Sequence, residues 1–298
     1  MKEIRQIMCF GEILWDCLPG CTRPGGAPLN VAFHLNKLGV KSKIASCVGN
    51  DKAGKDLTEF IRKAGLDTNL VKINKHLPTS KVDVYLDKDN NAKFEICNPV
   101  AWDEIRITPE LLTELNNSNA IVFGSLIARN KVSRETVLKL LIRKNLIKIL
   151  DVNLRPPYDD KETVKILLEK ADILKLNEEE LITITNWYEV DGNIVRRMHA
   201  LQKIYQFGTL IVTRGKDGAY LIHENVFFKH DGFMVNSIDT VGCGDAFLAG
   251  FLAALFDNKD MNQVLTEACS IGAFVATRVG ATPEYTKDDI YSFVDKSF

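Results

Sequence analysis

The stretch IDTVGCGDAF, residues 238–247, sets two glycines and an aspartate directly before the apolar run FLAGFLAALF, residues 247–256. An apolar run of this length, with small residues spaced along it, predicts a buried helix. Glycines let backbone amides approach a ligand closely, and a helix start adds unpaired N–H groups with a partial positive charge. The stretch is therefore either a site for an anion such as phosphate, with Asp245 doing chemistry beside it, or an ordinary helix start with Asp245 as its N-terminal acid.

Outward from this stretch, short apolar runs that predict buried strands alternate with helical patterns along most of the chain. The expected strands are 4–11, 43–49, 120–125, 148–153, 172–177 and 209–215, and two clear helical patterns cover 28–39 and 53–65. Such alternation implies a mostly parallel sheet covered by helices on both faces. Ligands of open α/β sheets bind beyond the carboxyl ends of the strands, so a site is expected in the loops there.

Residues 79–96 break this pattern, because apolar and polar residues alternate on both sides of DKDNN at 87–91. Alternation around a polar turn predicts a β-hairpin. A hairpin inserted in an α/β chain can be decoration, an oligomer contact or a lid over a site, and the pattern alone does not choose among them.

The bulk composition excludes several classes of protein. The chain has 298 residues, 46% of them hydrophobic, and a net charge of −1, which gives no sign of a nucleic-acid or membrane partner. No apolar run approaches the roughly 18–20 residues of a membrane span, and the first residues lack the pattern of a signal peptide. Seven cysteines without a CxxC pair favour reduced thiols in a cytoplasmic protein over a zinc site or a disulfide framework.

A second glycine loop, PGGAPLN at 24–30, also opens a helix. Gly25 and Gly26 allow close backbone approach, and Asn30 lies in the first helical turn, with Asp16 upstream. Asp and Asn side chains are good partners for sugar hydroxyls because they offer fixed acceptors and donors. Taken alone, this loop favours a plain turn before a capped helix.

Two further strand ends carry polar side chains. NEEE at 177–180 offers oxygens from Asn177 and Glu180, which suit Mg²⁺, although a solvated acidic helix start is common. DVNLRPP at 151–157 presents Asn153 and Arg155. Arginine suits phosphate or carboxylate recognition, whereas the two prolines alone would indicate a turn.

One segment imitates a nucleotide-binding loop. GNDKAGKD at 49–56 nearly matches the Walker A pattern, but Asp56 stands where a hydroxyl should bind Mg²⁺. This departure excludes a standard P-loop. The absence of G-x-G-x-x-G from the chain weakens the case for a Rossmann dehydrogenase.

Taken in order, these segments resemble the PfkB (ribokinase-like) family of sugar kinases over nearly the whole chain. DTVGCGD at 239–245 is similar to the family's C-terminal signature D-T-x-G-[AC]-G-D, GGAPLNVAFHLNKLG at 25–39 to its N-terminal signature, and NEEE to its N-x-x-E motif. Within the family, GEILWDCLPG, GGAPLN, PTSKVDVYLD and DVNLRP most resemble bacterial fructokinases.

The resemblance implies an α/β fold, a ribokinase-like three-layer sandwich with a mostly parallel central sheet and a small β-sheet lid. It implies one kinase domain over 1–298, with the lid formed by about 12–23 and 79–102. Lid edges often pair in this family, so a homodimer through the lid is one expected assembly.

The resemblance also implies roles for individual residues. Asp245 resembles the catalytic base, and the amides of Gly242, Cys243, Gly244 and Asp245 resemble the anion hole. The implied sugar contacts are Asp16, Gly25, Gly26 and Asn30, with Asn153 and Arg155 as additions. The implied ATP contacts are Thr213 and Gly215, together with Gly242 and Gly244.

Two cation sites are implied in the same way. Asn177 and Glu180 resemble the Mg²⁺ motif, acting through water. VATRVGATPE at 275–284 resembles a monovalent-cation loop, which would offer K⁺ the carbonyls of Asp239, Val241, Val275, Arg278 and Gly280. Many members carry a small hydroxyl residue near the end of that loop, whereas this chain has Glu284, a departure that bears on the potassium site.

The expected reaction is ATP + D-fructose → ADP + fructose 6-phosphate, with ATP, Mg²⁺ and K⁺ as the cofactors considered. A PfkB kinase for ribose, 2-keto-3-deoxygluconate or a nucleoside is the first alternative. A nucleotide-dependent oxidoreductase and a non-catalytic sugar- or nucleotide-binding protein are alternatives from other classes.

Overall fold

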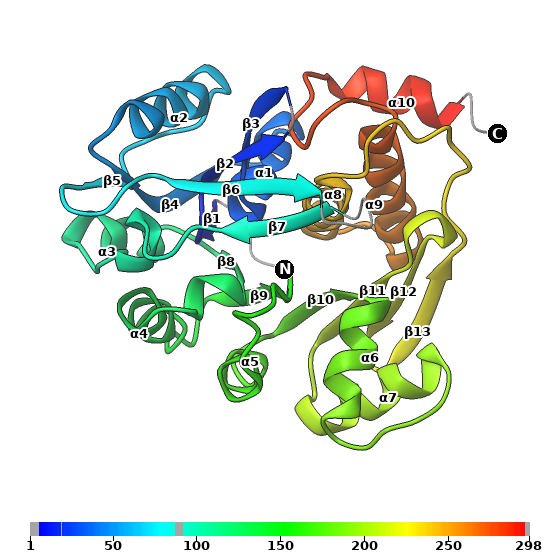
Figure 1. The fold of residues 1–298 in the computed structure, drawn as a ribbon. Coiled ribbons are helices and arrows are strands. Elements are labelled where there is room, and N and C mark those ends of the chain that lie inside the picture. The colour runs from blue at the N-terminus through cyan, green and yellow to red at the C-terminus, as the bar shows by residue number, and fades with distance from the viewer. Residues whose placement is uncertain (1–5, 19, 87–91, 296–298) are drawn as a thin grey trace.

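The computed structural model describes residues 6–18, 20–86 and 92–295, and its main sheet contains nine of the strands found there (Figure 1). The strand order is β13-β12-β11-β10-β9-β8-β1-β4-β5. The bounds are β1 (Ile7–Phe10), β4 (Ser42–Gly49), β5 (Val71–Asn74), β8 (Ala120–Gly124), β9 (Ile147–Asp151), β10 (Ile173–Asn177), β11 (Thr209–Thr213), β12 (Ala219–His223) and β13 (Val226–His230). Pairing is parallel from β5 to β11, and only β12 and β13 join in antiparallel register.

The helices lie in two layers, one on each face of this sheet. Their bounds are α1 (Ala27–Lys37), α2 (Lys52–Lys63), α3 (Pro109–Asn116), α4 (Lys131–Leu140), α5 (Lys161–Leu168), α6 (Glu178–Asn186), α7 (Ile194–Tyr205), α8 (Cys243–Phe256), α9 (Met261–Ala276) and α10 (Lys287–Asp295). Short 3₁₀ turns cover Ala101–Glu104, Leu126–Ala128 and Gly215–Asp217.

Successive residues of β1 show how the two layers are separated. Ile7 and Cys9 belong to a core shared with α1, α2, α8, α9 and α10, whereas Met8 and Phe10 belong to a second core shared with α3 to α7. Side chains of a strand alternate between its faces, so a run that is apolar throughout is suited to a sheet buried on both sides. The expected three-layer α/β sandwich with a mostly parallel sheet is confirmed, and each expected strand and helix is found within a few residues.

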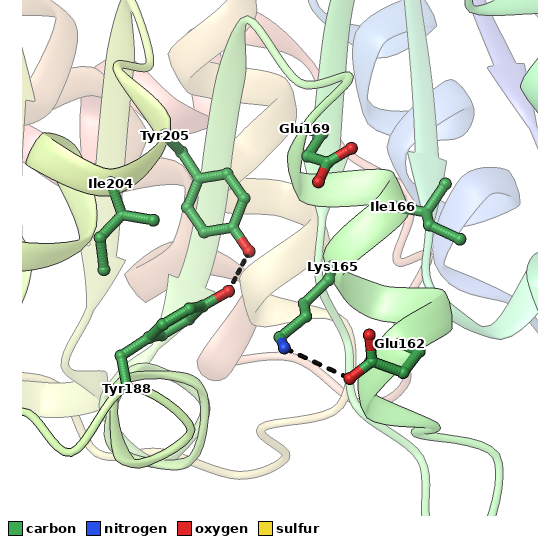
Figure 2. Close-up of a pocket in the computed structure, with 7 residues that line it drawn as sticks. All are labelled: Glu162, Lys165, Ile166, Glu169, Tyr188, Ile204 and Tyr205. Carbon is green, nitrogen blue, oxygen red and sulfur yellow. Dashed lines mark hydrogen bonds and ion pairs between the residues drawn. The ribbon is translucent and has the colours of Figure 1, made fainter.

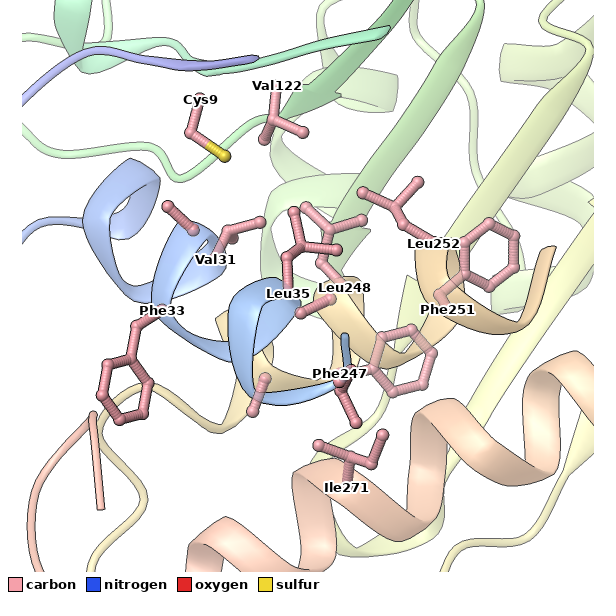
Figure 3. Close-up of a cluster of buried hydrophobic side chains, with 14 of the residues drawn as sticks. Cys9, Val31, Phe33, Leu35, Val122, Phe247, Leu248, Phe251, Leu252 and Ile271 are labelled. Atoms are coloured by element: carbon pink, nitrogen blue, oxygen red, sulfur yellow. The ribbon is translucent and has the colours of Figure 1, made fainter. Parts of the chain in front are cut away.

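The helix predicted from the opening stretch is α8, and it lies in the middle of the first core. Figure 3 shows Leu35 of α1 meeting Leu248 of α8, with Ile271 of α9 directed toward Phe247. A side chain at Gly250 would come within 2.7 Å of Ile271 Cδ1, so the glycine lets α8 and α9 pack closely. Close packing on both sides fixes the position of the amino-terminal end of α8.

A separate four-stranded sheet has the order β3-β2-β6-β7. Its strands are β2 (Leu14–Leu18), β3 (Cys21–Gly25), β6 (Ser80–Leu86) and β7 (Ala92–Ile96), and β6 and β7 pair antiparallel as a hairpin would (Figure 1, cyan). The segments expected to form a lid thus contribute strands to one sheet. Residue 19 and the predicted hairpin turn at 87–91 lie outside the described residues.

Among the helices of the described ranges, none is both long and apolar enough to cross a membrane.

Replacing Phe251 with alanine should lower the free energy of unfolding by about 3–5 kcal/mol, because a large buried ring is removed and a cavity is left. Phe251 is fully buried in α8, whereas Ile142 is 74% exposed. Urea denaturation followed by circular dichroism measures the loss, and Ile142→Ala should change stability by less than about 0.5 kcal/mol. Equal losses in the two variants would contradict this account of the core.

Candidate active site

The loop before α8 is held in a strained turn by its neighbours. Gly242 has φ +77°, and a Cβ there would lie 2.5 Å from the Cβ of Ala281, so only glycine fits. The Asp239 carboxylate accepts hydrogen bonds from the amides of Val241 and Gly280, each at 3.0 Å, and from Arg23 Nη1 at 2.9 Å. Burial raises the pKa of Asp239, but these hydrogen bonds outweigh it and hold the pKa below its usual range.

Asp245 lies in the first turn of α8 and is almost completely buried. Its Oδ2 accepts a hydrogen bond from Asn30 Nδ2 of α1 at 2.8 Å. Burial, reinforced by the nearby Asp151, raises the pKa of Asp245 to about 7, although Lys175 and the hydrogen bond from Asn30 pull it downward. A carboxyl group with such a pKa can accept a proton near neutral pH.

Buried acceptors without a donor lie around this carboxylate. In the described part of the chain, Asn30 Oδ1 and Glu12 Oε2 are buried and have no hydrogen-bond partner. Burial, reinforced by the charge of Asp245, raises the pKa of Glu12 to about 7, which places the two carboxyl groups near one another. Buried polar atoms are nearly always paired, so these oxygens fit a ligand that brings hydroxyl donors.

The predicted sugar contacts form a chain of contacts that leads to Asp245. A Cβ at Gly25 would lie 2.3 Å from Asp16 Oδ2, and a Cβ at Gly26, which has φ +109°, would lie 2.4 Å from the carbonyl oxygen of Glu12. Asn30 completes the chain through its bond to Asp245. Burial raises the pKa of Asp16 to about 6. The fold therefore brings together Asp16, Gly25, Gly26, Asn30 and Asp245, which span 229 positions of the sequence.

Asn153 and Arg155 bind one another at the edge of this cluster. Arg155 is exposed and donates from Nη2 to Asn153 Oδ1 at 2.9 Å. Its positive charge lowers the pKa of both Asp16 and Asp245, which places the guanidinium on the same side of the molecule as these carboxylates.

Asn177 and Glu180 form a capping box at the start of α6. The Asn177 side chain accepts from the Glu180 amide at 2.8 Å, and Glu180 Oε2 accepts from the Asn177 amide at 2.9 Å. Glu180 Oε1 accepts from the Leu154 amide at 2.9 Å. Both oxygens of this buried carboxylate are therefore occupied by backbone groups, which favours contact with a cation through water. The described residues hold no cluster of three or more His, Cys, Asp or Glu that could bind a metal directly.

Thr213 and Gly215 lie next to that capping box. Thr213 is the partner of Asn177 in the parallel pairing of β10 with β11. Gly215 has φ +57°, and a Cβ added there would have no atom within 4 Å. Arg214, between the two residues, forms an ion pair with Glu178 at 2.7 Å. The surface around Gly215 is thus open on the carboxyl side of β11.

The two segments of the expected potassium site lie side by side. Contacts of Gly242 with Ala281, and of Asp239 with Gly280, hold 239–242 against 280–281. The first segment includes the candidates Asp239 and Val241, and the second includes Gly280. Val275 lies in the last turn of α9, and Arg278 follows this helix. Glu284 forms an ion pair with Lys37 of α1 instead of turning into the loop.

Glu12, Asp151 and Lys175 were not selected from the sequence as site residues. Lys175 Nζ donates to both carboxylate oxygens of Asp151 at 2.8 Å, and both side chains are buried. Glu12 lies two residues beyond the end of β1 and Asp151 is the last residue of β9, which was the available signal, whereas Lys175 lies in the middle of β10.

The Walker-like segment at 49–56 has a structural use. Asp51 caps α2 by accepting from the Gly54 amide at 2.7 Å, and its carboxylate also accepts from the amide and hydroxyl of Thr79. Side chains at Gly49 or Gly54 would collide with Thr79. The two glycines therefore join α2 closely to the start of β6.

A pocket of about 400 Å³ lies elsewhere, between α5 and α7 (Figure 2). Its lining residues are Glu162, Lys165, Ile166, Glu169, Tyr188, Ile204 and Tyr205. None of the candidate site residues contributes to it, so it is separate from the cluster around Asp245.

Comparison with known proteins identifies the class. Residues 20–288 match the pfkB family carbohydrate kinases, so the protein is a phosphotransferase that acts on carbohydrates. The chain belongs to the pfkB family.

Three relatives illustrate the similarity. A sugar kinase of Pyrococcus horikoshii, PH1459, is 31% identical over 91% of this chain and 86% of its own length. Its structure in complex with ATP has a TM-score of 0.78, 29% identity, and coverage of 95% of this chain and 96% of that one. Fructokinase-2 of Solanum lycopersicum is 27% identical over 93% of this chain and 92% of its own. The fructokinase of Vibrio cholerae O395, solved with fructose, ADP and calcium, shares the fold with a TM-score of 0.83 and 24% identity, over 98% of this chain and 99% of that one.

Replacing Gly242 with alanine should destabilise the protein and slow any turnover, because the new methyl group collides with Ala281 in addition to straining the backbone. Gly20→Ala is the matched control, since Gly20 has a similar φ of +81° but no atom within 4 Å of its would-be Cβ. We expect Gly242→Ala to lose about 1–3 kcal/mol more than Gly20→Ala in urea denaturation. Equal stability of the two variants would show that the loop relaxes freely.

Proposed function

We propose that this protein is a fructokinase that catalyses ATP + D-fructose → ADP + fructose 6-phosphate. The observation that carries the proposal is the buried Asp245, bonded to Asn30 at the amino-terminal end of α8, between a glycine loop and a group of unpaired acceptors. Support for fructose comes from the similarity to Fructokinase-2 and from the fructose-bound fructokinase that shares the fold.

Asp245 acts as the general base in this proposal. A primary hydroxyl is a poor nucleophile near neutral pH, and Asp245 accepts its proton as the bond to phosphorus forms. A positioned base contributes about 10²–10⁴-fold to the rate. The charge of Asp245 is held next to the reacting group because the Asn30 amide orients the carboxylate.

The amides of Gly242, Cys243, Gly244 and Asp245 hold the oxygens of the phosphoryl group that is transferred. Amides at a helix start carry a partial positive charge, and their orientation is fixed before the reaction, so they stabilise developing negative charge. Asn177 and Glu180 would hold the water shell of a Mg²⁺ ion bound with the nucleotide, and the ion would supply positive charge that neutralises the phosphates. Burial raises the pKa of the Cys243 thiol to about 11, so this residue contributes its amide and remains a neutral thiol.

The sugar occupies the space bounded by Asp16, Gly25, Gly26 and Asn30, with Asn153 and Arg155 at its rim. The unpaired oxygens of Asn30 and Glu12 accept hydrogen bonds from the hydroxyl groups of the substrate, which suits a polyol better than an apolar substrate. Thr213 and Gly215 contact the nucleotide. The carbonyls that would hold K⁺ are those of Asp239, Val241, Val275, Arg278 and Gly280.

The whole chain, 1–298, forms one kinase domain in this proposal, and the sheet β3-β2-β6-β7 is its lid. The lid excludes water, which would otherwise compete with the sugar for the phosphoryl group. Pairing of lid edges would give a homodimer, and seven cysteines without a disulfide between them fit a cytoplasmic location.

A sugar acid such as 2-keto-3-deoxygluconate is the second candidate substrate. Arg155 favours it, because an exposed guanidinium beside the predicted pocket can bind a carboxylate. Fructose has no such group.

The proposal is tested by ADP release from Mg-ATP with fructose, ribose, glucose, 2-keto-3-deoxygluconate and adenosine offered separately. We expect turnover with fructose to exceed that with each other compound at least tenfold in kcat/KM. Turnover with the sugar acid alone would replace the substrate and give Arg155 its role. ATP binding without turnover of any compound would favour a non-catalytic protein.

Asp245→Asn should lower kcat at least about a hundredfold, because the amide cannot accept the proton, while the KM for sugar and ATP stays within about threefold. Steady-state kinetics of ADP release measures both constants. Asp257→Asn, at the exposed carboxyl-terminal end of the same helix, is the matched control and should behave as the unaltered protein. Unchanged kcat in Asp245→Asn would exclude Asp245 as the base.

A further inference from the structure

Lys175 is a buried lysine in the main sheet, and its ammonium group is fixed in place. Lys175 of β10 and Asp151 of β9 are register partners in parallel pairing, and Nζ lies 2.8 Å from both carboxylate oxygens. Exposed fractions are 6% for Lys175 and 3% for Asp151. A buried ion pair contributes little net stability, because desolvating the two charges offsets their attraction. Its presence therefore calls for a reason other than stability.

The position of the pair supplies that reason. Asp151 is the last residue of β9, and its register partner Lys175 lies two residues before the end of β10, so the pair lies near the edge of the sheet where the site is built. A Cβ added to Gly244 would lie 3.3 Å from Lys175 Nζ, so the ammonium group packs against the backbone of the anion-binding loop. Gly244 immediately precedes Asp245 in the first turn of α8. The cation thus lies directly behind the loop and next to the carboxylate.

Charged groups from several elements face Asp245. Asp151 of β9 raises its pKa, whereas Lys175 of β10 and Arg155, in the loop after β9, lower it. The charge of Asp245 in turn adds to burial in raising the pKa of Glu12, which follows β1, and of the Cys243 thiol of α8.

Lys175 holds a buried carboxylate on one side and meets the loop on the other. Its Nζ donates to both oxygens of Asp151 and packs against the backbone of Gly244, the residue before Asp245. Lys175 is therefore a cation fixed between one buried carboxylate and the start of α8.

We propose that Lys175, held by Asp151, is a positioning residue for phosphoryl transfer: it places a fixed positive charge between the anion-binding loop and Asp245. Lys175 keeps Asp245 ionised before the reaction, and the negative charge of Asp151 keeps that carboxylate basic enough to accept a proton. Removing the charge of Asp151 should therefore lower the pKa of Asp245, whereas removing the charge of Lys175 should raise it.

Asp151→Asn tests this role, because asparagine keeps the shape of the side chain and an acceptor for Lys175 but removes the negative charge. The acid limb of kcat/KM for the sugar, near pH 7 in the unaltered protein, should move to lower pH by about one unit. The repulsion that raises the pKa of Asp245 is lost while the attraction of Lys175 remains. A weaker base should also lower the plateau kcat by about three- to tenfold.

Lys148→Met is the matched control. Lys148 of β9 forms an ion pair at 3.2 Å with Asp172, immediately before β10, so it joins the same two strands at their opposite ends. The acid limb of kcat/KM for the sugar in Lys148→Met should stay at the pH found for the unaltered protein. A well-folded Asp151→Asn protein with an unchanged acid limb and kcat would overturn the proposal.

The double variant Asp151→Asn/Lys175→Met covers the case in which the single variant does not fold, since it removes both members of the buried ion pair together. The loss of the cation behind the loop should lower its kcat at least about tenfold, with the KM for ATP and sugar within threefold. Unaltered kcat in the folded double variant would overturn the proposal.

Because this role presupposes the reaction proposed above, Asp245→Asn is measured in parallel. Full activity of Asp245→Asn would reject the base itself. An inactive Asp245→Asn beside an Asp151→Asn protein with unaltered kinetics would reject only the role of the ion pair.

Discussion

A hydrogen bond from Asn30 to Asp245 joins two helices whose residues are 215 positions apart in the sequence, and the geometry of the site depends on it. The bond forms because α1 and α8 pack side by side in one core, where Leu35 meets Leu248 and Gly250 brings α9 close. Apolar packing therefore determines where a buried carboxylate lies. Burial in turn raises its proton affinity, so packing and chemistry cannot be separated at this position.

Much of the fold could be predicted from the sequence because its signals are local. The alternation of strand and helix patterns reflects constraints that act within a few residues. The glycines at 242, 25 and 26 marked tight turns, although the atoms that crowd them belong to Ala281, Asp16 and Glu12, elsewhere in the chain. Pairings across strands left no such signal. Lys175 and Asp151 meet because of the register between β9 and β10. Glu12 can be assigned to the site only from the fold, in which Gly26 packs against its carbonyl group.

Two motifs show how a local pattern can carry more than one meaning. Asn177 and Glu180 match a cation-binding motif and also form a capping box, and the same oxygens serve the backbone of α6 and the Leu154 amide. The segment 49–56 nearly matches a phosphate-binding loop but joins α2 to Thr79. One fold can host several substrates, so in the proposed site the side chains around Asp16 and Arg155 are the ones expected to distinguish one sugar from another.

The carboxylate of Asp239 has a consequence for how this sequence can change over time. It accepts from Arg23 in the small sheet and from the amides of Val241 and Gly280, so one side chain serves three separate segments. A replacement at position 239 would release all three together, and no single second substitution could restore them. In descendants of this gene, residues 23 and 239 are therefore expected to be retained or lost together, even though Arg23 is partly exposed, whereas the main-chain amides of 241 and 280 constrain residue identity less.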